Sequence, residues 1–227
     1  MKNLQRIIYA MPDRILDRSG SIFYSAPAAF EGKREIYILG LNSGGDPAAQ
    51  QENTIRKHYE EWAERTEAYS SYVDEIWEGS VAGAHGMQPR IRHLAKHLGI
   101  DLRLTPSSNV VFVRSATEAK LEAEKKELLD ACWPVHQAVI DELGIRSIIC
   151  LGKTAGWWVR ERLGAHKELD SFQETNKRGW WSTAHLSPEG KVVCTLTHPG
   201  RVDWSNPDAD PAAMVERVLR NDLRPQT

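Results

Sequence analysis

Four short apolar runs, none of which alternates with polar residues, constrain the fold of this chain more than any other feature. Strands that are buried on both faces have this pattern, and they are typical of parallel sheets that helices cover on both sides. The runs are Glu35–Leu41, Asn109–Arg114, Ser147–Leu151 and Val192–Leu196. We therefore predict an α/β fold with three layers, α/β/α, around a central four-stranded, mainly parallel sheet.

Helix-length segments lie between these runs and after the last one. Several of them end at a glycine, which commonly follows the last turn of a helix. The predicted helical segments are Ala48–Trp77, Gln88–Leu98, Thr117–Leu143, Thr154–Leu163 and Pro211–Leu223. Within Trp180–Thr195, the residues Ser187-Pro188-Glu189-Gly190 predict the turn of a hairpin.

The connection from Gly44 to Ser108 is much longer than an ordinary loop. We expect it to hold a helical insert around residues 48–105 that serves as a lid or a specificity element. The 227 residues contain no internal repeat and no low-complexity linker, so we predict one domain that spans residues 1–227.

Composition excludes several classes of protein. A hydrophobic content of 41% and a net charge of −2 exclude a disordered chain and a strongly basic nucleic-acid coat protein. Three cysteines are too few for a four-cysteine zinc or iron–sulfur site. No apolar run reaches the roughly 18 residues of a membrane span, and the first residues lack a signal-peptide pattern. We therefore expect a cytoplasmic protein that does not contact membranes.

Glycines and polar residues follow three of the four predicted strands, at the edge where open α/β sheets bind their ligands. These segments are Gly40-Leu41-Asn42-Ser43-Gly44, Gly152-Lys153-Thr154 and His198-Pro199-Gly200-Arg201. An asparagine amide can orient a water or read a base edge, and a neutral histidine can donate a hydrogen bond to a leaving group. From the residues alone, a helix cap at Asn42 and a structural role for His198 remain equally open.

Two other motifs are incomplete. Gly152-Lys153-Thr154 is not a P-loop because Ser147 stands where that motif requires its first glycine, although the following helix can offer N–H groups to a phosphate. His93 and His97 have the i,i+4 spacing of a metal pair, but the chain offers no obvious third ligand. We therefore predict that the protein binds no metal.

Taken together, these residues resemble the uracil-DNA glycosylase superfamily. Gly40-Leu41-Asn42-Ser43-Gly44 is similar to the first family motif, Gly-x-Asn-Pro-Gly, and His198-Pro199-Gly200 is similar to the His-Pro-Ser motif. Ser108–Val111 resembles the strand that carries the base-reading asparagine, and Ile149–Ala155 resembles the third strand and its turn. The order of the motifs agrees with the family from residue 35 to about residue 205.

The resemblance implies a monofunctional DNA glycosylase of DNA repair that acts as a monomer without a cofactor. It would hydrolyse the N-glycosidic bond of a flipped-out uracil or modified pyrimidine and leave an abasic site. Asn42 would position the attacking water, and His198 would bind the carbonyl oxygen of the departing base. The implied substrate-binding residues are Gly40, Leu41, Ser43, Gly44, Asn109 and Tyr59, with Trp62 and Phe112 as further stacking candidates. The implied DNA-binding residues are Gly152, Lys153, Thr154, Gly200, Arg201 and Trp204.

Three other functions stay open. Ser43 replaces the usual proline, Gly200 replaces the usual serine and the insert is enlarged, which would suit a hydroxymethylated or glucosylated cytosine of phage DNA and a role in antiviral defence. A non-catalytic nucleic-acid binding module predicts salt-sensitive DNA binding without an abasic product. A nucleosidase or nucleotide-binding enzyme would act on free nucleosides and ignore DNA.

Overall fold

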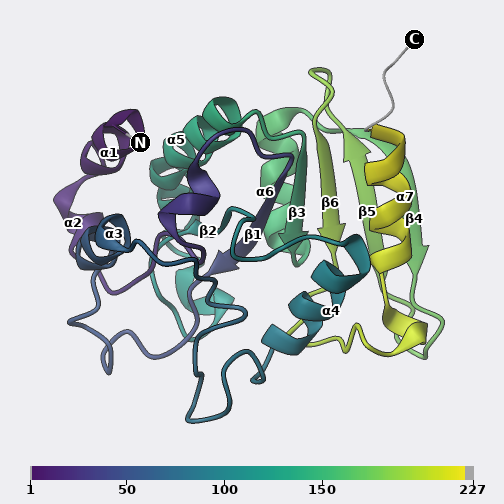
Figure 1. The fold of residues 1–227 in the computed structure, drawn as a ribbon, viewed down its shortest axis with the longest axis horizontal. Coiled ribbons are helices and arrows are strands. Elements are labelled where there is room, and N and C mark those ends of the chain that lie inside the picture. Colours follow the sequence, from purple (N-terminus) through teal and green to yellow (C-terminus); the bar gives the residue numbers. More distant parts are fainter. Residues whose placement is uncertain (1, 223–227) are drawn as a thin grey trace.

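A computed structural model describes residues 2–222 and has a mixed sheet at its centre (Figure 1). Within those residues the sheet has six strands in the order β2-β1-β3-β6-β5-β4. The strands are β1 (Ile36–Asn42), β2 (Ser107–Val111), β3 (Ser147–Leu151), β4 (Lys167–Gln173), β5 (Trp181–Leu186) and β6 (Val192–Leu196). β2, β1, β3 and β6 are parallel, whereas β5 is antiparallel to both of its neighbours.

The predicted four-stranded sheet was therefore too small, because β4 and β5 extend it. Each of the four apolar runs overlaps a parallel strand, and the hairpin between β5 and β6 turns at residues 187–190 as predicted. β4 was missed because its sequence, Lys-Glu-Leu-Asp-Ser-Phe-Gln, contains no apolar run and none of its side chains is fully buried. A strand at the edge of a sheet tolerates charged residues that a central strand does not.

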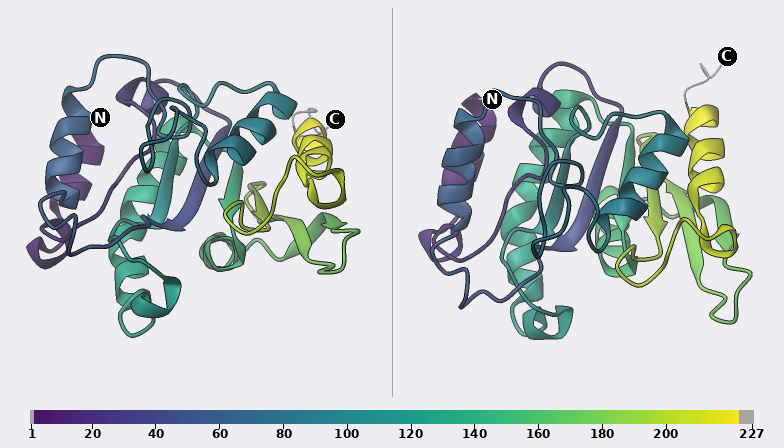
Figure 2. Two further views of the ribbon diagram at one scale, coloured as in Figure 1. Left: turned by 90° about the horizontal axis from the view of Figure 1, so that it is seen from below. Right: turned by 60° about the horizontal axis from the view of Figure 1, so that its bottom comes forward.

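Within the described part of the chain, seven α-helices surround this sheet. They are α1 (Lys2–Tyr9), α2 (Asp13–Leu16), α3 (Ile55–Glu64), α4 (Gln88–Leu98), α5 (Lys125–Leu143), α6 (Lys153–Leu163) and α7 (Ala212–Asp222). α4 and α7 lie on the face of the sheet that is in front in Figure 1, and α5 and α6 lie behind it, as both views of Figure 2 confirm. Helices thus cover both faces of the sheet, as an α/β fold requires.

Two of the predicted helices are longer than those that form. Of residues 48–77 only α3 is helical, and residues 65–87 run as irregular chain. The segment 117–143 begins with a 3₁₀ turn, Glu118–Leu121, before α5 starts. α4 has the predicted bounds, whereas Leu223, the predicted last residue of the final helix, lies outside the described residues. In the stretch 2–222, no helix combines the length and the apolar composition that a membrane span needs.

The strands separate two hydrophobic cores. Tyr37 and Leu39 of β1 belong to the core that includes residues of α3 and α5, whereas Ile38 belongs to the core beneath α4 and α7. Because successive strand residues point to opposite faces, Gly40 and Asn42 lie on the same face as Ile38. The polar end of β1 therefore opens on the α4 and α7 side of the sheet.

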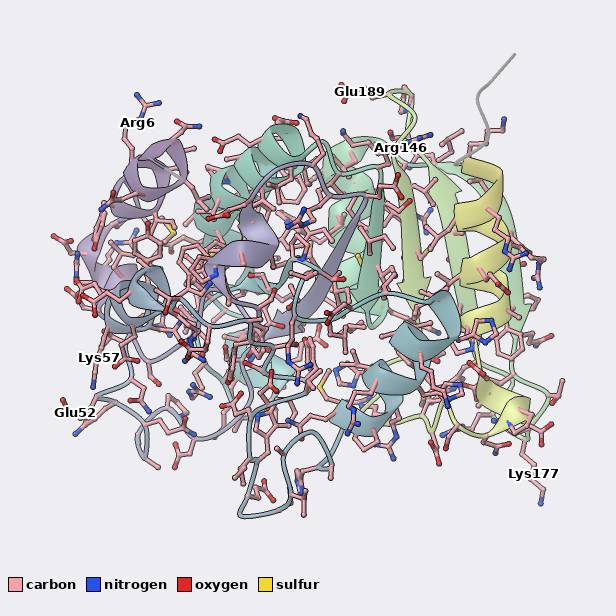
Figure 3. All side chains as sticks on the ribbon, viewed as in Figure 1. Arg6, Glu52, Lys57, Arg146, Lys177 and Glu189 are labelled. Carbon is pink, nitrogen blue, oxygen red and sulfur yellow. The ribbon has the colours of Figure 1, made fainter. Side chains whose placement is uncertain are left out.

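The strand order changes direction at β1, and this change positions the site. The chain passes from β1 to β2 on one side and then crosses to β3 on the other side of β1. The loops that follow β1 and β3 therefore diverge, and the crevice between them is where open α/β sheets bind ligands. Glu189, at the tip of the β5–β6 hairpin, lies at the other end of the strands, away from their carboxyl ends (Figure 3).

Candidate functional site at the carboxyl ends of the parallel strands

A cleft of about 1090 Å³ lies at the carboxyl ends of the four parallel strands. It brings together most of the residues that the sequence singled out, although they come from distant parts of the chain. The predicted residues that line it are Gly40, Leu41, Asn42, Gly44, Asn109, Gly152, Lys153, Thr154, His198 and Arg201. The convergence of these residues on one cleft is the central observation about the site.

Four predicted side chains do not line the cleft, and the ligand contacts proposed for them were wrong. One of them, the stacking candidate Phe112, is 0% exposed in the hydrophobic core. The Ser43 side chain is fully buried, and its Oγ accepts a hydrogen bond from Tyr24 Oη at 3.1 Å. Tyr59 packs in the core against Trp62, with the ring centroids 5.6 Å apart. Trp204 is 0% exposed in the core beneath α4 and α7, so its side chain cannot enter a DNA duplex from this position.

Asn42 ends β1 with its amide group held in one orientation. Its Nδ2 donates to Ser43 O at 2.7 Å and to Ser115 O at 3.2 Å. The amide N–H groups are thereby used, and Oδ1 remains the acceptor that is available to a water in the cleft. The alternative role as a helix cap is wrong, because the next helix, α3, begins after Thr54, which caps it.

Asn109 lies beside β1 at the floor of the cleft. Gly40 and Asn109 are register partners, and a Cβ at position 40 would stand 2.1 Å from Asn109 Oδ1. Glycine at position 40 is therefore what lets this side chain lie across the sheet. Asn109 is only 5% exposed, and in the described chain its Nδ2 has no hydrogen-bond partner. A buried donor without a partner costs about 1–3 kcal/mol. The nitrogen is enclosed by protein, and the Tyr24 hydroxyl lies close to the amide.

His198 follows β6 and is held as a neutral hydrogen-bond donor. The Gly200 N–H donates to His198 Nδ1 at 3.0 Å, so the ring proton of the neutral form lies on Nε2. Burial lowers the pKa of His198, and the nearby positive charge of Arg201 lowers it further. The imidazole is therefore uncharged at neutral pH, with one N–H free to donate.

Two glycines enclose the imidazole of His198. A Cβ at Gly152 would lie 3.1 Å from the ring, and a Cβ at Gly200 would lie 3.0 Å from it. Gly152 also has φ +119°, a conformation that side-chain-bearing residues rarely adopt. Gly200 therefore does not line the cleft but contributes by leaving room for the ring. Both glycines were predicted to contact DNA, and of the two only Gly152 lines the cleft.

Three of the cations that line the cleft follow parallel strands of the sheet. Arg114 follows β2, Lys153 begins α6 after β3, and Arg201 follows β6. Among residues 2–222, none of the three has a carboxylate partner in an ion pair. Unpaired cations at the mouth of a cleft favour phosphate groups. Arg114 was not predicted, because its position after β2 became meaningful only once the cleft was known.

The predicted phosphate contact at Thr154 is partly occupied. Thr154 Oγ1 donates to Glu118 Oε1 at 2.8 Å, so its hydroxyl hydrogen is already used within the protein. Lys153 and the backbone at the start of α6 remain the groups of this segment that can meet an anion. Further carboxylates line the side of the cleft that the insert forms, at Glu61, Glu75 and Glu78.

The insert forms the other wall of the cleft, and of its aromatic lining the sequence analysis named only Trp62. Its aromatic lining residues are Trp62, Tyr69, Tyr72 and Trp77, and Tyr24 of the N-terminal segment stacks on Tyr72 with centroids 5.6 Å apart. Tyr24 also contacts the β1 loop through Ser43. No local sequence pattern predicts this wall, because its residues lack the periodicity of a helix or a strand.

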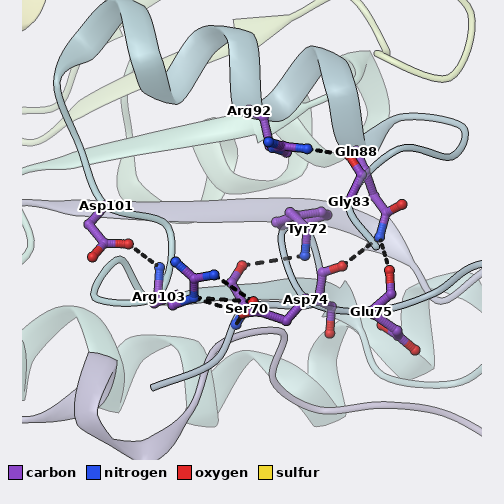
Figure 4. Close-up of polar contacts among 10 residues, drawn as sticks. Ser70, Tyr72, Asp74, Glu75, Gly83, Gln88, Arg92, Asp101 and Arg103 are labelled. Carbon is purple, nitrogen blue, oxygen red and sulfur yellow. Dashed lines mark hydrogen bonds and ion pairs between the residues drawn. The ribbon is translucent and has the colours of Figure 1, made fainter. Parts of the chain in front are cut away.

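Side-chain hydrogen bonds hold this wall in place (Figure 4). The fully buried Gln88 donates from Nε2 to Ser71 O at 2.7 Å and to Glu75 O at 2.9 Å, and its Oε1 accepts from the His85 N–H at 3.0 Å. Arg103 donates to the Asp74 carboxylate, with Nη2 2.6 Å from Oδ1 and Nε 2.9 Å from Oδ2. The irregular chain is therefore fixed by contacts between residues that are distant in sequence.

The histidine pair on α4 faces α7 rather than the cleft. His93 Nε2 lies 2.8 Å from Asp210 Oδ2, and His97 Nε2 lies 3.2 Å from Glu216 Oε2. Each imidazole therefore joins α4 to the segment around α7, which accounts for the spacing that resembled a metal pair.

Comparison with known proteins adds no relative: no family model matches the chain, and no curated protein matches it. The function of the cleft therefore has to follow from its own residues.

Proposed function

We propose that this chain is a monofunctional DNA glycosylase with the three-layer fold of the uracil-DNA glycosylases. It would hydrolyse the N-glycosidic bond of a flipped-out pyrimidine and leave an abasic site. One observation carries the proposal: the acceptor oxygen of Asn42, the unpaired amide of Asn109 and the neutral imidazole of His198 all line a single cleft.

The spacing of the strands supports this assignment. Asn42 ends β1 and His198 follows β6, and β3 lies between these two strands. Two strand spacings separate their backbones by about 10 Å, since neighbouring strands lie about 4.8 Å apart. That gap accommodates the base and the sugar of one nucleotide between the water-orienting amide and the donating imidazole.

The chemistry follows from these positions. The bond between C1′ of the sugar and the ring nitrogen of the base breaks, and its electron pair leaves with the base while the sugar becomes oxocarbenium-like. His198 Nε2–H donates to the carbonyl oxygen on which negative charge develops. A water held by Asn42 Oδ1 adds its hydroxyl to C1′, and its proton leaves to solvent and finally to the base.

Asn109 supplies the base preference in this scheme. Its Nδ2 is a buried donor, and it would meet the base once the side chains that enclose it, including Tyr24, make room. Position 4 of uracil presents a carbonyl acceptor, whereas cytosine presents a donor at the same position. The buried amide therefore favours uracil over unmodified cytosine. Tyr24 is half-buried and lines the cleft, so it would contact the base, while Tyr72 is buried and supports the Tyr24 ring by stacking on it.

Incubation with defined DNAs tests the proposal. Oligonucleotides that contain uracil, and matched ones that contain only standard bases, are treated with the protein and then with alkali, which cleaves abasic sites. We expect cleavage of the uracil strand, and loss of cleavage in Asn42→Ala and His198→Ala. His166→Ala is the matched control, because this histidine is exposed and does not line the cleft. Full activity in both cleft variants would overturn the proposal.

The size of the cleft favours a second candidate substrate. Its volume of about 1090 Å³ exceeds what one pyrimidine ring fills and matches pockets for much larger ligands, which are about 300–1,000 Å³. A cytosine that carries a hydroxymethyl or glucosyl group, as in modified phage DNA, would use this space, and the protein would then serve antiviral defence. Phage DNA with modified cytosine, included in the same alkali assay, distinguishes the two substrates.

A further inference from the structure

An exposed tryptophan lies beside His198 in a loop that the mechanism does not use. The loop 174–180 joins β4 to β5. Because β4 runs in the same direction as β6, this loop lies at the carboxyl ends of the parallel strands, where the cleft is. Trp180, its last residue, is 36% exposed and lines the cleft together with His198 and Arg201. Figure 3 shows Lys177 of this loop at the lower edge of the molecule, away from the hairpin tip at Glu189.

The indole of Trp180 is paired with a cation. The Arg178 guanidinium carbon lies 5.1 Å from the ring centroid, and Arg178 Nη1 donates to Arg201 O at 3.0 Å. One side chain thus joins the aromatic ring to the backbone of the segment that follows His198. An aromatic face next to a guanidinium matches a nucleotide, whose base stacks on the ring while its phosphate meets the cation.

A buried carboxylate holds this arrangement in place. The Glu174 side chain is buried, and its Oε2 accepts from Arg178 Nε at 3.2 Å and from Asn176 Nδ2 at 2.9 Å. The Glu174 N–H donates to Trp180 O at 2.9 Å and closes the loop. Burying a carboxylate is costly unless it is paired and hydrogen-bonded, and here Oε2 is paired whereas Oε1 is buried without a partner among the described residues. The ion pair offsets part of this cost and holds the Arg178 side chain in place.

We propose that Trp180, with Arg178 and Arg201, forms a stacking platform for an unpaired nucleobase next to the target nucleotide, so that the protein prefers single-stranded DNA. This inference rests on the proposed function, since it takes DNA as the substrate. A base that stacks on an indole has left its own duplex stack, and a single strand supplies such a base without the cost of unpairing. Stacking tolerates any base because every base has a π-face, so the platform sets strand form rather than sequence.

Trp181 provides a matched control within the same chain. It is 47% exposed, comparable to its neighbour, but it starts β5 with its side chain on the opposite face and does not line the cleft. Trp180→Ala removes the proposed platform, and Trp180→Phe keeps an aromatic ring there. Trp181→Ala leaves the platform unchanged. Since both side chains are well exposed, we expect all three variants to fold.

Binding is measured with a fluorescein-labelled thymidine oligonucleotide of about 12 nucleotides, single-stranded or paired, at low salt. We expect the parent protein to bind the single strand more tightly than the duplex. Trp180→Ala should weaken single-strand binding by about 5- to 150-fold, Trp180→Phe should retain most of the affinity, and Trp181→Ala should match the parent.

Two results would overturn the platform. One is equal single-strand affinity of Trp180→Ala and the parent, and the other is a parent protein that does not bind single-stranded DNA. The oligonucleotide contains no uracil, so this readout does not depend on base release. The absence of an abasic product from any DNA would instead refute the glycosylase assignment, and the two proposals therefore fail separately.

Discussion

The two walls of the cleft are held by different forces. On the sheet wall, Asn42, Asn109 and His198 lie on or directly after strands whose backbone hydrogen bonds fix them. On the insert wall, Trp62 lies on α3, whereas the other aromatic residues lie on irregular chain that Gln88 and the Asp74–Arg103 pair hold by their side chains. The side chains of Asn42 and His198 can therefore be changed with little loss of fold, whereas the insert wall depends on a few polar contacts.

Removal of the imidazole should produce the largest effect, and it should appear in the rate. His198→Ala is expected to lower kcat for base release by about 10²- to 10³-fold, the cost of losing one preorganised donor. The urea midpoint should stay close to that of the parent, because the side chain is half-buried and is hydrogen-bonded by one backbone N–H. A midpoint that fell along with the rate would assign His198 a structural role instead.

Loss of the buried glutamine should affect stability rather than rate. Gln88→Ala leaves one buried carbonyl, one partly buried carbonyl and one partly buried N–H without their partner, so we expect a loss of about 2–3 kcal/mol in the free energy of unfolding, measured by urea denaturation. Gln137→Ala is the control, since this glutamine of α5 donates only to the exposed carboxylate of Asp141 on the same helix. If both variants were equally stable, the insert wall would not depend on Gln88.

The contact between Gly40 and Asn109 should behave as a coupled pair. Gly40→Ala places a methyl group 2.1 Å from Asn109 Oδ1 and should cost about 1–3 kcal/mol, while Gly44→Ala meets nothing within 4 Å and should cost less. Combining Gly40→Ala with Asn109→Ala should recover part of the loss, because the second change removes the clash. Strict additivity of the two changes, measured by urea denaturation, would show that this contact does not form.

The smallest effect is expected at the ion pair of the insert wall. Arg103 lowers the pKa of Asp74 below its usual 3.8, so the pair stabilises the fold above that pH. The contribution is lost as the pH falls through the lowered pKa, because the protonated carboxyl no longer pairs. Asp74→Asn should lower the free energy of unfolding by about 0.5–1 kcal/mol at neutral pH. Below the lowered pKa of Asp74 the variant and the parent should be equally stable. A difference from the parent that persisted in strong acid would contradict this account.

The sequence predicted the sheet wall much better than the insert wall, for a physical reason. A strand buried on both faces must be apolar along its whole length, so the strands that contain Tyr37, Ile149 and Cys194 could be recognised from local sequence. The contact of Asp74 with Arg103 depends on residues 29 positions apart, and no local pattern encodes it.

The tryptophans illustrate the same limit. Trp204 follows His198 closely in the sequence and was predicted to contact DNA, but it fills the core beneath α4 and α7. Trp180 is farther along the chain from His198 and yet lines the same cleft. Exposure of a single aromatic residue is decided by tertiary packing, which composition and spacing do not specify.

The hairpin tip at Glu189 is a suitable labelling site for these measurements. It is exposed and lies at the end of the strands that faces away from the cleft (Figure 3). A cysteine introduced there could carry a dye or tether the protein to a surface, because the native thiols Cys132, Cys150 and Cys194 are all buried. Immobilised molecules would then present the cleft outward, where DNA can reach it.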